Sequence, residues 1–227
     1  KYLVPDNKNS IFDISNTILN YSKNTKYEND GIIYTHFKKK IIDTKSYGDY
    51  PILKWKPPEL NSIDFVIKFS KIKKYYNSSR YILVNEDITY NNILYRKVYF
   101  YNGSKGNNLI RFNRHRNDHI LIPVQNNKIY DKYGNEIMDD TVIEAVYDKH
   151  NSEDSNCNWV ILRTRHDKTA KYISSNKTQK AGNNVTIAYL IWKTILYPVT
   201  EDVIRGNTYW VTSDRHSKSN NLSGMRF

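Results

Sequence analysis

Residues 51–58 read PILKWKPP, and this stretch separates two parts of the chain that differ in texture. Prolines flank it and exclude a helix, because proline lacks an amide hydrogen and its ring clashes with the preceding turn. We therefore predict an extended segment with a stiff exit. Residues two apart in a strand point to the same side, so Lys54 and Lys56 are expected to project together, with Trp55 packed opposite. We place a domain boundary after Pro58.

Before this boundary the sequence predicts one helix and a pair of strands. Apolar residues recur at helical spacing over residues 9–21, where either Ser10 or Asp13 could cap the start. Residues 30–35 (DGIIYT) predict a turn that enters a buried strand, and the basic run at 38–40 leads to a second strand at 41–42. These elements form the first predicted domain, residues 1–58.

After the boundary come short β-rich runs separated by turn-forming residues. About six strands without long helices between them are typical of a small β-barrel or sandwich, and an oligonucleotide/oligosaccharide-binding (OB) barrel has the right size. The predicted fold class is therefore α+β, with an OB-fold domain at residues 59–170. The predicted strands are 63–69, 80–84, 94–101, 120–124, 142–147 and 158–165, with turns at 101–103, 125–127 and 133–136.

The remaining residues, 171–227, are predicted to be a helical connector. Residues 185–197 are apolar at helical spacing, opened by Asn183 or Asn184 and stopped by Pro198. A second short helix is predicted from a Thr200 cap to a terminating Gly206.

Composition limits the class of protein. The 227 residues have 39% hydrophobic and 26% charged side chains, which is a globular balance, and no apolar run approaches the ~18 residues of a membrane span. The single cysteine, Cys157, cannot form an internal disulfide, so a cytoplasmic setting is expected. The chain starts with Lys1 and is expected to be a fragment of a larger protein. Its net charge of +12 indicates a polyanion partner, or only a lysine-rich surface.

Three short signals could carry chemistry. Asp30 with Gly31, before a buried strand, can hold a carboxylate beside a ligand or metal, although such a pair is commonly only a turn. The paired lysines of residues 53–57 (LKWKP) suit a phosphate, or else only keep an edge strand soluble. Residues 163–168 (RTRHDK) are predicted to end a strand with Arg163, Arg165 and Asp167 on one face and Lys168 following, a set of donors suited to phosphate oxygens.

The order of these signals over residues 29–168 resembles motifs IV, V and VI of the covalent nucleotidyltransferases, most closely the mRNA capping guanylyltransferases. In that family motif IV reads Asp-Gly-apolar-Ile, motif V Leu-Lys-Trp-Lys-Pro and motif VI Arg-x-Arg-x-Asp-Lys. Residues 53–57 match motif V without a substitution. Residues 62–65 (SIDF) also resemble the segment that follows motif V in these enzymes.

The resemblance implies a two-step reaction through lysyl-GMP, with GTP and Mg²⁺ or Mn²⁺ bound between the nucleotidyltransferase and OB domains and GMP passed to the 5′-diphosphate end of RNA. Asp30 would lie near the metal and α-phosphate, and Lys54 and Lys56 would hold the α-phosphate. When the OB domain closes, the β- and γ-phosphates would meet motif VI, which is Arg163, Arg165, Asp167 and Lys168.

The chain also departs from the family pattern. The nucleophile motif Lys-x-Asp-Gly and the Asp-Gly-Glu of motif III are absent, so the nucleophile lysine is predicted to lie outside this chain. The missing amino-terminal half of the nucleotidyltransferase domain would come from a parent chain or a companion chain. The tail, including residues 223–227, resembles the connector to a cap methyltransferase domain in multifunctional viral-type capping enzymes.

Two alternatives remain open. ATP-dependent nucleic-acid ligases share this architecture and chemistry. A non-catalytic OB module could instead bind single-stranded nucleic acid by basic grooves and stacking on tyrosines such as Tyr75, Tyr76 and Tyr95. The basic cluster at residues 111–116 could touch RNA or be a solvated loop. The six histidines show no metal-ligand spacing, so no zinc site is predicted.

Overall fold

The computed structural model describes residues 9–35, 52–104, 108–112, 119–152, 154–175 and 182–210. It divides into two compact units: unit 1 is Lys1–Leu60 with Leu196–Phe227, and unit 2 is Asn61–Ile195. The division falls two residues after the predicted boundary and distributes the predicted connector over both units. Predictions for residues 38–42, 114–116 and 223–227 lie outside the described residues.

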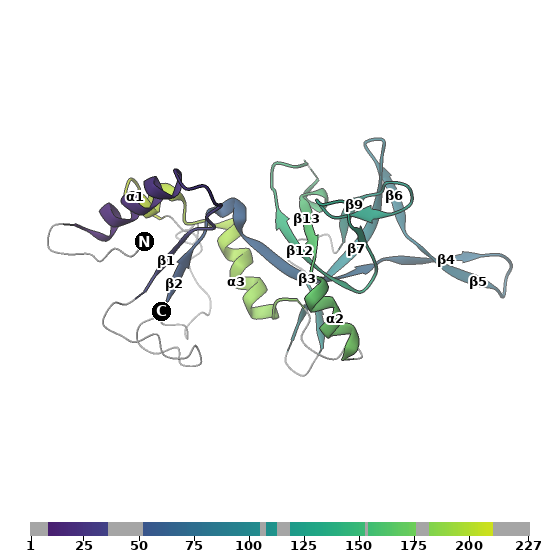
Figure 1. Ribbon diagram of the computed structural model, residues 1–227. Coiled ribbons are helices and arrows are strands. Elements are labelled where there is room, and N and C mark those ends of the chain that lie inside the picture. Colours follow the sequence, from purple (N-terminus) through teal and green to yellow (C-terminus); the bar gives the residue numbers. More distant parts are fainter. Residues whose placement is uncertain are drawn as a thin grey trace, which may run out of the picture. The chain divides into compact units, whose positions relative to one another are not determined.

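Unit 1 combines elements from both ends of the chain (Figure 1). Its first helix was correctly predicted, and Ser10 is its cap: the Ser10 hydroxyl accepts from the Asp13 amide, while the Asp13 carboxylate accepts from the Ser10 amide. The unit contains α1 (Ile11–Ser22), β1 (Ile32–Tyr34), β2 (Leu53–Trp55), the 3₁₀ turn η1 (Pro58–Leu60) and α4 (Glu201–Arg205).

The core of unit 1 is small. Leu19, Ile32 and Trp55 form its buried cluster, and the Trp55 indole Nε1–H donates to the Val199 carbonyl at 2.7 Å. Helix α4 is attached to α1 because Arg205 donates to the Asn16 side-chain oxygen at 2.8 Å. The chain after Leu196 is therefore part of the fold of unit 1.

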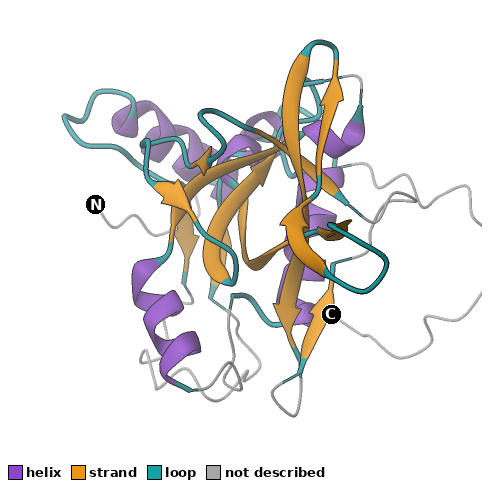
Figure 2. Ribbon diagram, turned by 90° about the vertical axis from the view of Figure 1, so that its right-hand side faces the viewer, coloured by secondary structure: helices purple, strands orange, loops and turns teal. Residues whose placement is uncertain are grey.

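Unit 2 is built on an antiparallel sheet of order β13-β12-β3-β7-β6, with β8 and β9 also paired to β7 (Figure 1). The long strands curve strongly along their length (Figure 2). Two further pairs, β4–β5 and β10–β11, stand outside this sheet. The strands are β3 (Ser62–Phe69), β4 (Lys71–Tyr75), β5 (Tyr81–Asn85), β6 (Asp87–Tyr90), β7 (Ile93–Gly103), β8 (Leu109–Arg111), β9 (Ile120–Pro123), β10 (Ile129–Tyr130), β11 (Glu136–Ile137), β12 (Thr141–Tyr147) and β13 (Trp159–Thr164).

Aromatic side chains dominate the core of unit 2. Phe65 stacks on Phe100 with ring centroids 4.7 Å apart, and Trp159 stacks on Trp192 of helix α3 (Val185–Leu196) at 5.6 Å. Helix α3 was predicted, and Asn184 opens it by accepting from the Thr186 amide. The α+β class is confirmed. The pairings of the described strands do not close the sheet into a barrel, so the OB arrangement stays a prediction.

Three local predictions need correction. Residues 101–103 are not a turn, because they continue β7 and pair with β8. Helix α2 (His166–Ser174) was not predicted, because the alternating pattern of residues 158–168 indicated one strand and its end. The predicted strand runs also missed β4, β6, β8, β10 and β11.

Within the described residues, no helix is both long and apolar enough to cross a membrane.

Candidate functional site

The first candidate site is the Asp30 cluster, which consists of Asp30, Lys54 and Lys56 in unit 1. Strands β1 and β2 pair antiparallel, with Ile33 opposite Lys54. The Nζ atoms of Lys54 and Lys56 both reach the Asp30 Oδ2 atom, at 2.9 and 3.2 Å. The two lysines therefore do lie together, while Trp55 is buried on the other side of β2.

The backbone conformation at position 31 explains why a glycine follows Asp30. Its φ is +132°, a backbone conformation that side chains disfavour. A Cβ atom at this position would lie 1.9 Å from the Trp55 carbonyl oxygen. Only a glycine lets the chain approach β2 this closely, and that approach brings Asp30 within reach of both lysines.

Gly31→Ala is therefore expected to destabilise the protein by about 2 kcal/mol, from backbone strain and the clash with Trp55. Urea unfolding followed by tryptophan fluorescence measures the effect. Gly134→Ala is the matched control, because Gly134 also has a positive φ, of +81°, but a Cβ there would meet nothing within 4 Å. Equal losses in the two variants would contradict the close-approach explanation.

The Asp30 cluster is accessible and carries net positive charge. The exposed fractions of the Asp30, Lys54 and Lys56 side chains are 61, 43 and 33%. Hydrogen bonds from Lys54 and then Lys56 lower the pKa of Asp30, so its carboxylate is ionised at neutral pH. Two ammonium groups around one carboxylate leave a surplus charge of about +1, which suits a phosphate oxygen.

The Asp30 cluster offers one carboxylate as a ligand for a divalent cation. Among the described residues no group of three or more His, Cys, Asp or Glu side chains could hold a metal by itself. Asp30 fits the pattern of Mg²⁺, which protein sites hold by one or two carboxylates together with substrate phosphates and water.

The second candidate site is the Arg165 cluster in unit 2, which consists of Asp64, Glu144, Arg163, Arg165 and Lys168. Arg165 Nη1 donates to both carboxylate oxygens of Asp64, at 3.0 and 2.9 Å, and Lys168 Nζ donates to the same carboxylate. Arg163 Nε donates to Glu144 at 2.8 Å. Adjacent strands bring the two acids together, because Asp64 of β3 pairs with Glu144 of β12.

The prediction that residues 163–168 lie at the end of a strand is only partly correct. Strand β13 ends at Thr164 and α2 begins at His166, so Asp167 and Lys168 lie on a helix and not on the face of a strand. Lys168 turns back to Asp64, whereas Asp167 stays exposed and accepts from Arg165 Nε at 3.4 Å. The predicted neighbours still come together, but through a helix turn.

Asp64 and Glu144 were not among the residues predicted to form the site. Asp64 is 7% exposed and lies in a run of buried apolar side chains. An acid in such a run requires a cationic partner, because an unpaired buried charge is costly. This signal was present in residues 62–69 (SIDFVIKF) and again around Glu144 in VIEAV, residues 142–146.

Glu144 should make stability depend on pH. Burial by itself raises its pKa, but hydrogen bonds from Ser62 and Arg163 outweigh burial and hold the pKa below its ordinary 4.5. A lowered pKa stabilises the fold above the unfolded-state value, and this contribution is lost as pH falls through the folded-state value. Glu144→Gln should cost about 1 kcal/mol at pH 7 and progressively less below about pH 4.5. Urea unfolding from pH 7 to pH 3 tests this; a constant difference would contradict it.

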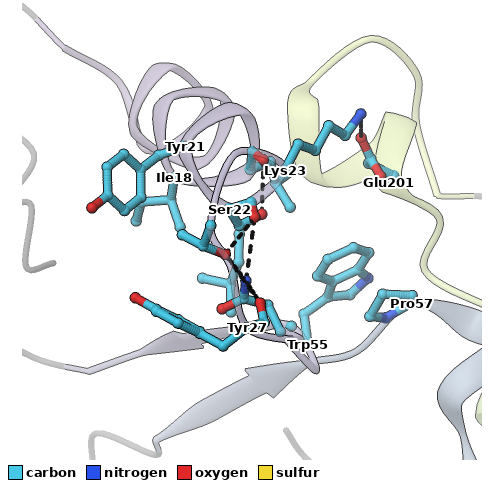
Figure 3. Close-up of a pocket in the computed structure, with 13 residues that line it drawn as sticks. Ile18, Tyr21, Ser22, Lys23, Tyr27, Trp55, Pro57 and Glu201 are labelled. Atoms are coloured by element: carbon cyan, nitrogen blue, oxygen red, sulfur yellow. Dashed lines mark hydrogen bonds and ion pairs between the residues drawn. The ribbon is translucent and has the colours of Figure 1, made fainter.

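A cavity of about 200 Å³ lies in unit 1 between α1 and β2 (Figure 3). Its lining includes Tyr21, Tyr27, Trp55 and Pro57 but none of the Asp30 cluster. Lys23 and Glu201 form an ion pair at its rim, 3.4 Å apart. The cavity is thus on the Trp55 side of β2, away from the two lysines.

Comparison with known proteins places the chain in a family. No family model matches it. Over 196 residues, which cover 81% of this chain, it is 35% identical to a protein of Acanthamoeba polyphaga mimivirus named "Probable mRNA-capping enzyme". The chain belongs to the mRNA-capping enzyme family. This confirms the predicted resemblance to mRNA capping enzymes. The match covers only 16% of the length of that relative.

Proposed function

We propose that this chain is the phosphate-binding part of an mRNA guanylyltransferase, which transfers GMP from GTP to the 5′-diphosphate end of RNA. The Asp30 cluster carries the proposal, because two ammonium groups converge on one exposed carboxylate within 3.2 Å. This is the arrangement that phosphoryl transfer needs, since its catalysis is mostly positioning and electrostatic stabilisation. Membership of the capping family supports it.

The proposed reaction has two steps. A lysine outside this chain attacks the α-phosphorus of GTP, which forms a P–N bond, breaks the bond from the α-phosphorus to the bridging oxygen and releases pyrophosphate. A terminal oxygen of the RNA diphosphate then attacks the same phosphorus and breaks the P–N bond. The lysine is regenerated and capped RNA is released.

The Asp30 cluster is proposed to act on the α-phosphate. Lys54 and Lys56 would hold its oxygens and stabilise the negative charge that develops in the transition state. Asp30 keeps the two ammonium groups in place and would supply one ligand to Mg²⁺ or Mn²⁺. The metal would neutralise phosphate charge when bound.

The Arg165 cluster is proposed to bind the β- and γ-phosphates of the same nucleotide. Asp64 engages only Nη1 of Arg165, and among the described residues Nη2 has no hydrogen-bond partner. Asp64 would therefore fix the guanidinium plane while Nη2 remains available to a phosphate oxygen. Arg163 and Lys168 would add charge, and Asp167 would orient Arg165.

We also propose a domain organisation and a set of partners for this chain. Residues 59–170 would form an OB-fold domain after the end of a nucleotidyltransferase domain at 1–58. The partners would be GTP, the RNA 5′ end, the missing half of the nucleotidyltransferase domain and a cap methyltransferase domain. The setting would be the cytoplasm, a virion or a viral factory.

The proposal is tested by incubating an enzyme preparation that contains this chain with α-labelled GTP and Mg²⁺ or Mn²⁺, followed by a denaturing gel. Label is expected on the polypeptide that carries the motif I lysine, and pyrophosphate should remove it. Labelling by ATP in place of GTP would assign the chain to the ligases. Absence of label with both nucleotides would overturn nucleotidyl transfer.

A further inference from the structure

Strands β4 and β5 form a hairpin that extends away from the main sheet of unit 2 (Figure 1). All ten side chains of the two strands are exposed except that of Val84, which is half-buried. A two-stranded hairpin with both faces in water is marginally stable by itself. Its exposed aromatic and aliphatic side chains therefore call for an explanation beyond folding.

One face of the hairpin combines aromatic rings with lysines. Residues that pair across the strands share a face, and Tyr75 pairs with Tyr81 while Lys73 pairs with Leu83. The two tyrosine rings lie 5.6 Å apart, and Lys73 Nζ lies 4.3 Å from the centroid of the Tyr81 ring. The exposed fractions of Tyr75 and Tyr81 are 59 and 47%. Both rings are open to a ligand.

The charge of the hairpin has one sign. Residues 71–85 include Lys71, Lys73, Lys74 and Arg80 but no acidic residue. Lys71, at the base, pairs with Asp139. In the described part of the chain no carboxylate lies within 4 Å of the charged nitrogens of the other three. Exposed cations beside accessible rings are the chemistry that binds a single nucleic-acid strand, where cations meet phosphates and rings stack on unpaired bases.

We propose that the β4–β5 hairpin is a binding arm for single-stranded RNA, with bases stacked on Tyr75 and Tyr81. Its phosphates would pair with Lys73 on the same face, with Lys74, which pairs with Ile82 on the opposite face, and with Arg80 next to Tyr81. The assignment of RNA as the natural strand rests on the proposed capping function. The stacking and charge contacts are argued from the hairpin itself and do not depend on that function. The arm would give the acceptor RNA a contact surface outside the two clusters described above.

The first test measures the charge contacts. Binding of a fluorescently labelled 12-nucleotide single-stranded RNA to the 227-residue chain is followed by anisotropy at several salt concentrations. Each phosphate contact contributes about 0.7 to the slope of log affinity against log salt, so Lys73→Ala with Lys74→Ala should reduce the slope by about 1.4. The matched control is Lys132→Ala with Lys149→Ala, which removes two exposed lysines elsewhere in unit 2. An equal change in both pairs would overturn the proposal.

The second test measures stacking. Tyr81→Ala should weaken binding about tenfold, whereas Tyr81→Phe keeps the ring and should bind within about twofold of wild type. The same RNA in a duplex offers no unpaired base, so Tyr81→Ala should leave duplex binding unchanged. Circular dichroism should be unchanged in all variants because the side chains are exposed. A wild-type affinity of Tyr81→Ala for the single strand would overturn the stacking role and leave the hairpin as a surface for another partner.

The two proposals can fail separately. Formation of protein–GMP from GTP needs no RNA, so hairpin variants should label as wild type in the test described above. If the protein is labelled by GTP but the hairpin variants bind RNA as tightly as wild type, only the proposal of the binding arm is wrong. Hairpin-dependent RNA binding without labelling by any nucleotide would support the arm and overturn the guanylyltransferase proposal.

Discussion

Lys54→Ala is expected to lower the rate of protein–GMP formation about a thousandfold in an enzyme preparation that contains this chain. Lys54 is the closer of the two lysines to Asp30, at 2.9 Å, and we propose that its ammonium group stabilises charge on the α-phosphate. Removing one such donor typically costs a hundredfold to a thousandfold in rate. Single-turnover labelling with α-labelled GTP measures the loss.

Two further variants serve as controls for Lys54→Ala. Lys23→Ala removes a lysine of the same unit whose side chain is 64% exposed, against 43% for Lys54, and which lines the cavity on the other side of β2. This variant should label within about twofold of wild type. Lys54→Arg keeps the charge but changes the donor geometry, and an intermediate rate is expected. The proposed role of Lys54 would be wrong if Lys54→Ala labelled within fivefold of wild type.

Arg165→Ala is expected to have the second largest effect, with about a hundredfold loss of labelling and a loss of stability of about 2 kcal/mol. Removing one partner of a buried ion pair typically costs 3–5 kcal/mol, and we expect less here because the Arg165 side chain is 22% exposed and Lys168 still pairs with Asp64. Urea unfolding measures the stability term. Lys128→Ala, which breaks the exposed pair with Glu136, is the control and should cost under about 0.5 kcal/mol.

A double-mutant cycle separates the structural and functional roles of Arg165. If Asp64 holds Arg165, then Asp64→Asn with Arg165→Ala should be little less stable than the worse single variant. Asp64→Asn alone keeps Arg165 and should mainly raise the KM for GTP, because the guanidinium is less well positioned. Additive stability losses would contradict the positioning role of Asp64.

Local sequence predicted the elements whose ends are set by near neighbours. The capping pair Ser10 and Asp13 fixed the start of α1, and Gly206, with φ +77°, ends α4 as predicted. The prediction failed at residues 101–103, where Asn102 and Gly103 read as a turn. Asn102 is instead fully buried in β7, and its side-chain amide donates to the carbonyls of Asp64 and Asn183. Distant partners outweighed the local turn preference.

The candidate site shows the same division. The two-residue period of a strand was sufficient to put Lys54 and Lys56 on one side and Trp55 on the other, because adjacent side chains alternate whatever the strand packs against. It did not indicate that Asp30, 24 residues away from Lys54, would receive both ammonium groups. That contact depends on the pairing of β1 with β2 and on the close approach at Gly31.

The sequence by itself therefore determined the basic residues, their motif order and the side of the strand on which the two lysines project. The tertiary structure decided which acids restrain them. Arg165 meets Asp64 across 101 residues, and Lys168 reaches the same carboxylate only because α2 turns it back. The physical reason is that backbone geometry is set by adjacent residues, whereas an ion pair between distant residues forms only when the whole sheet brings strands such as β3 and β12 together.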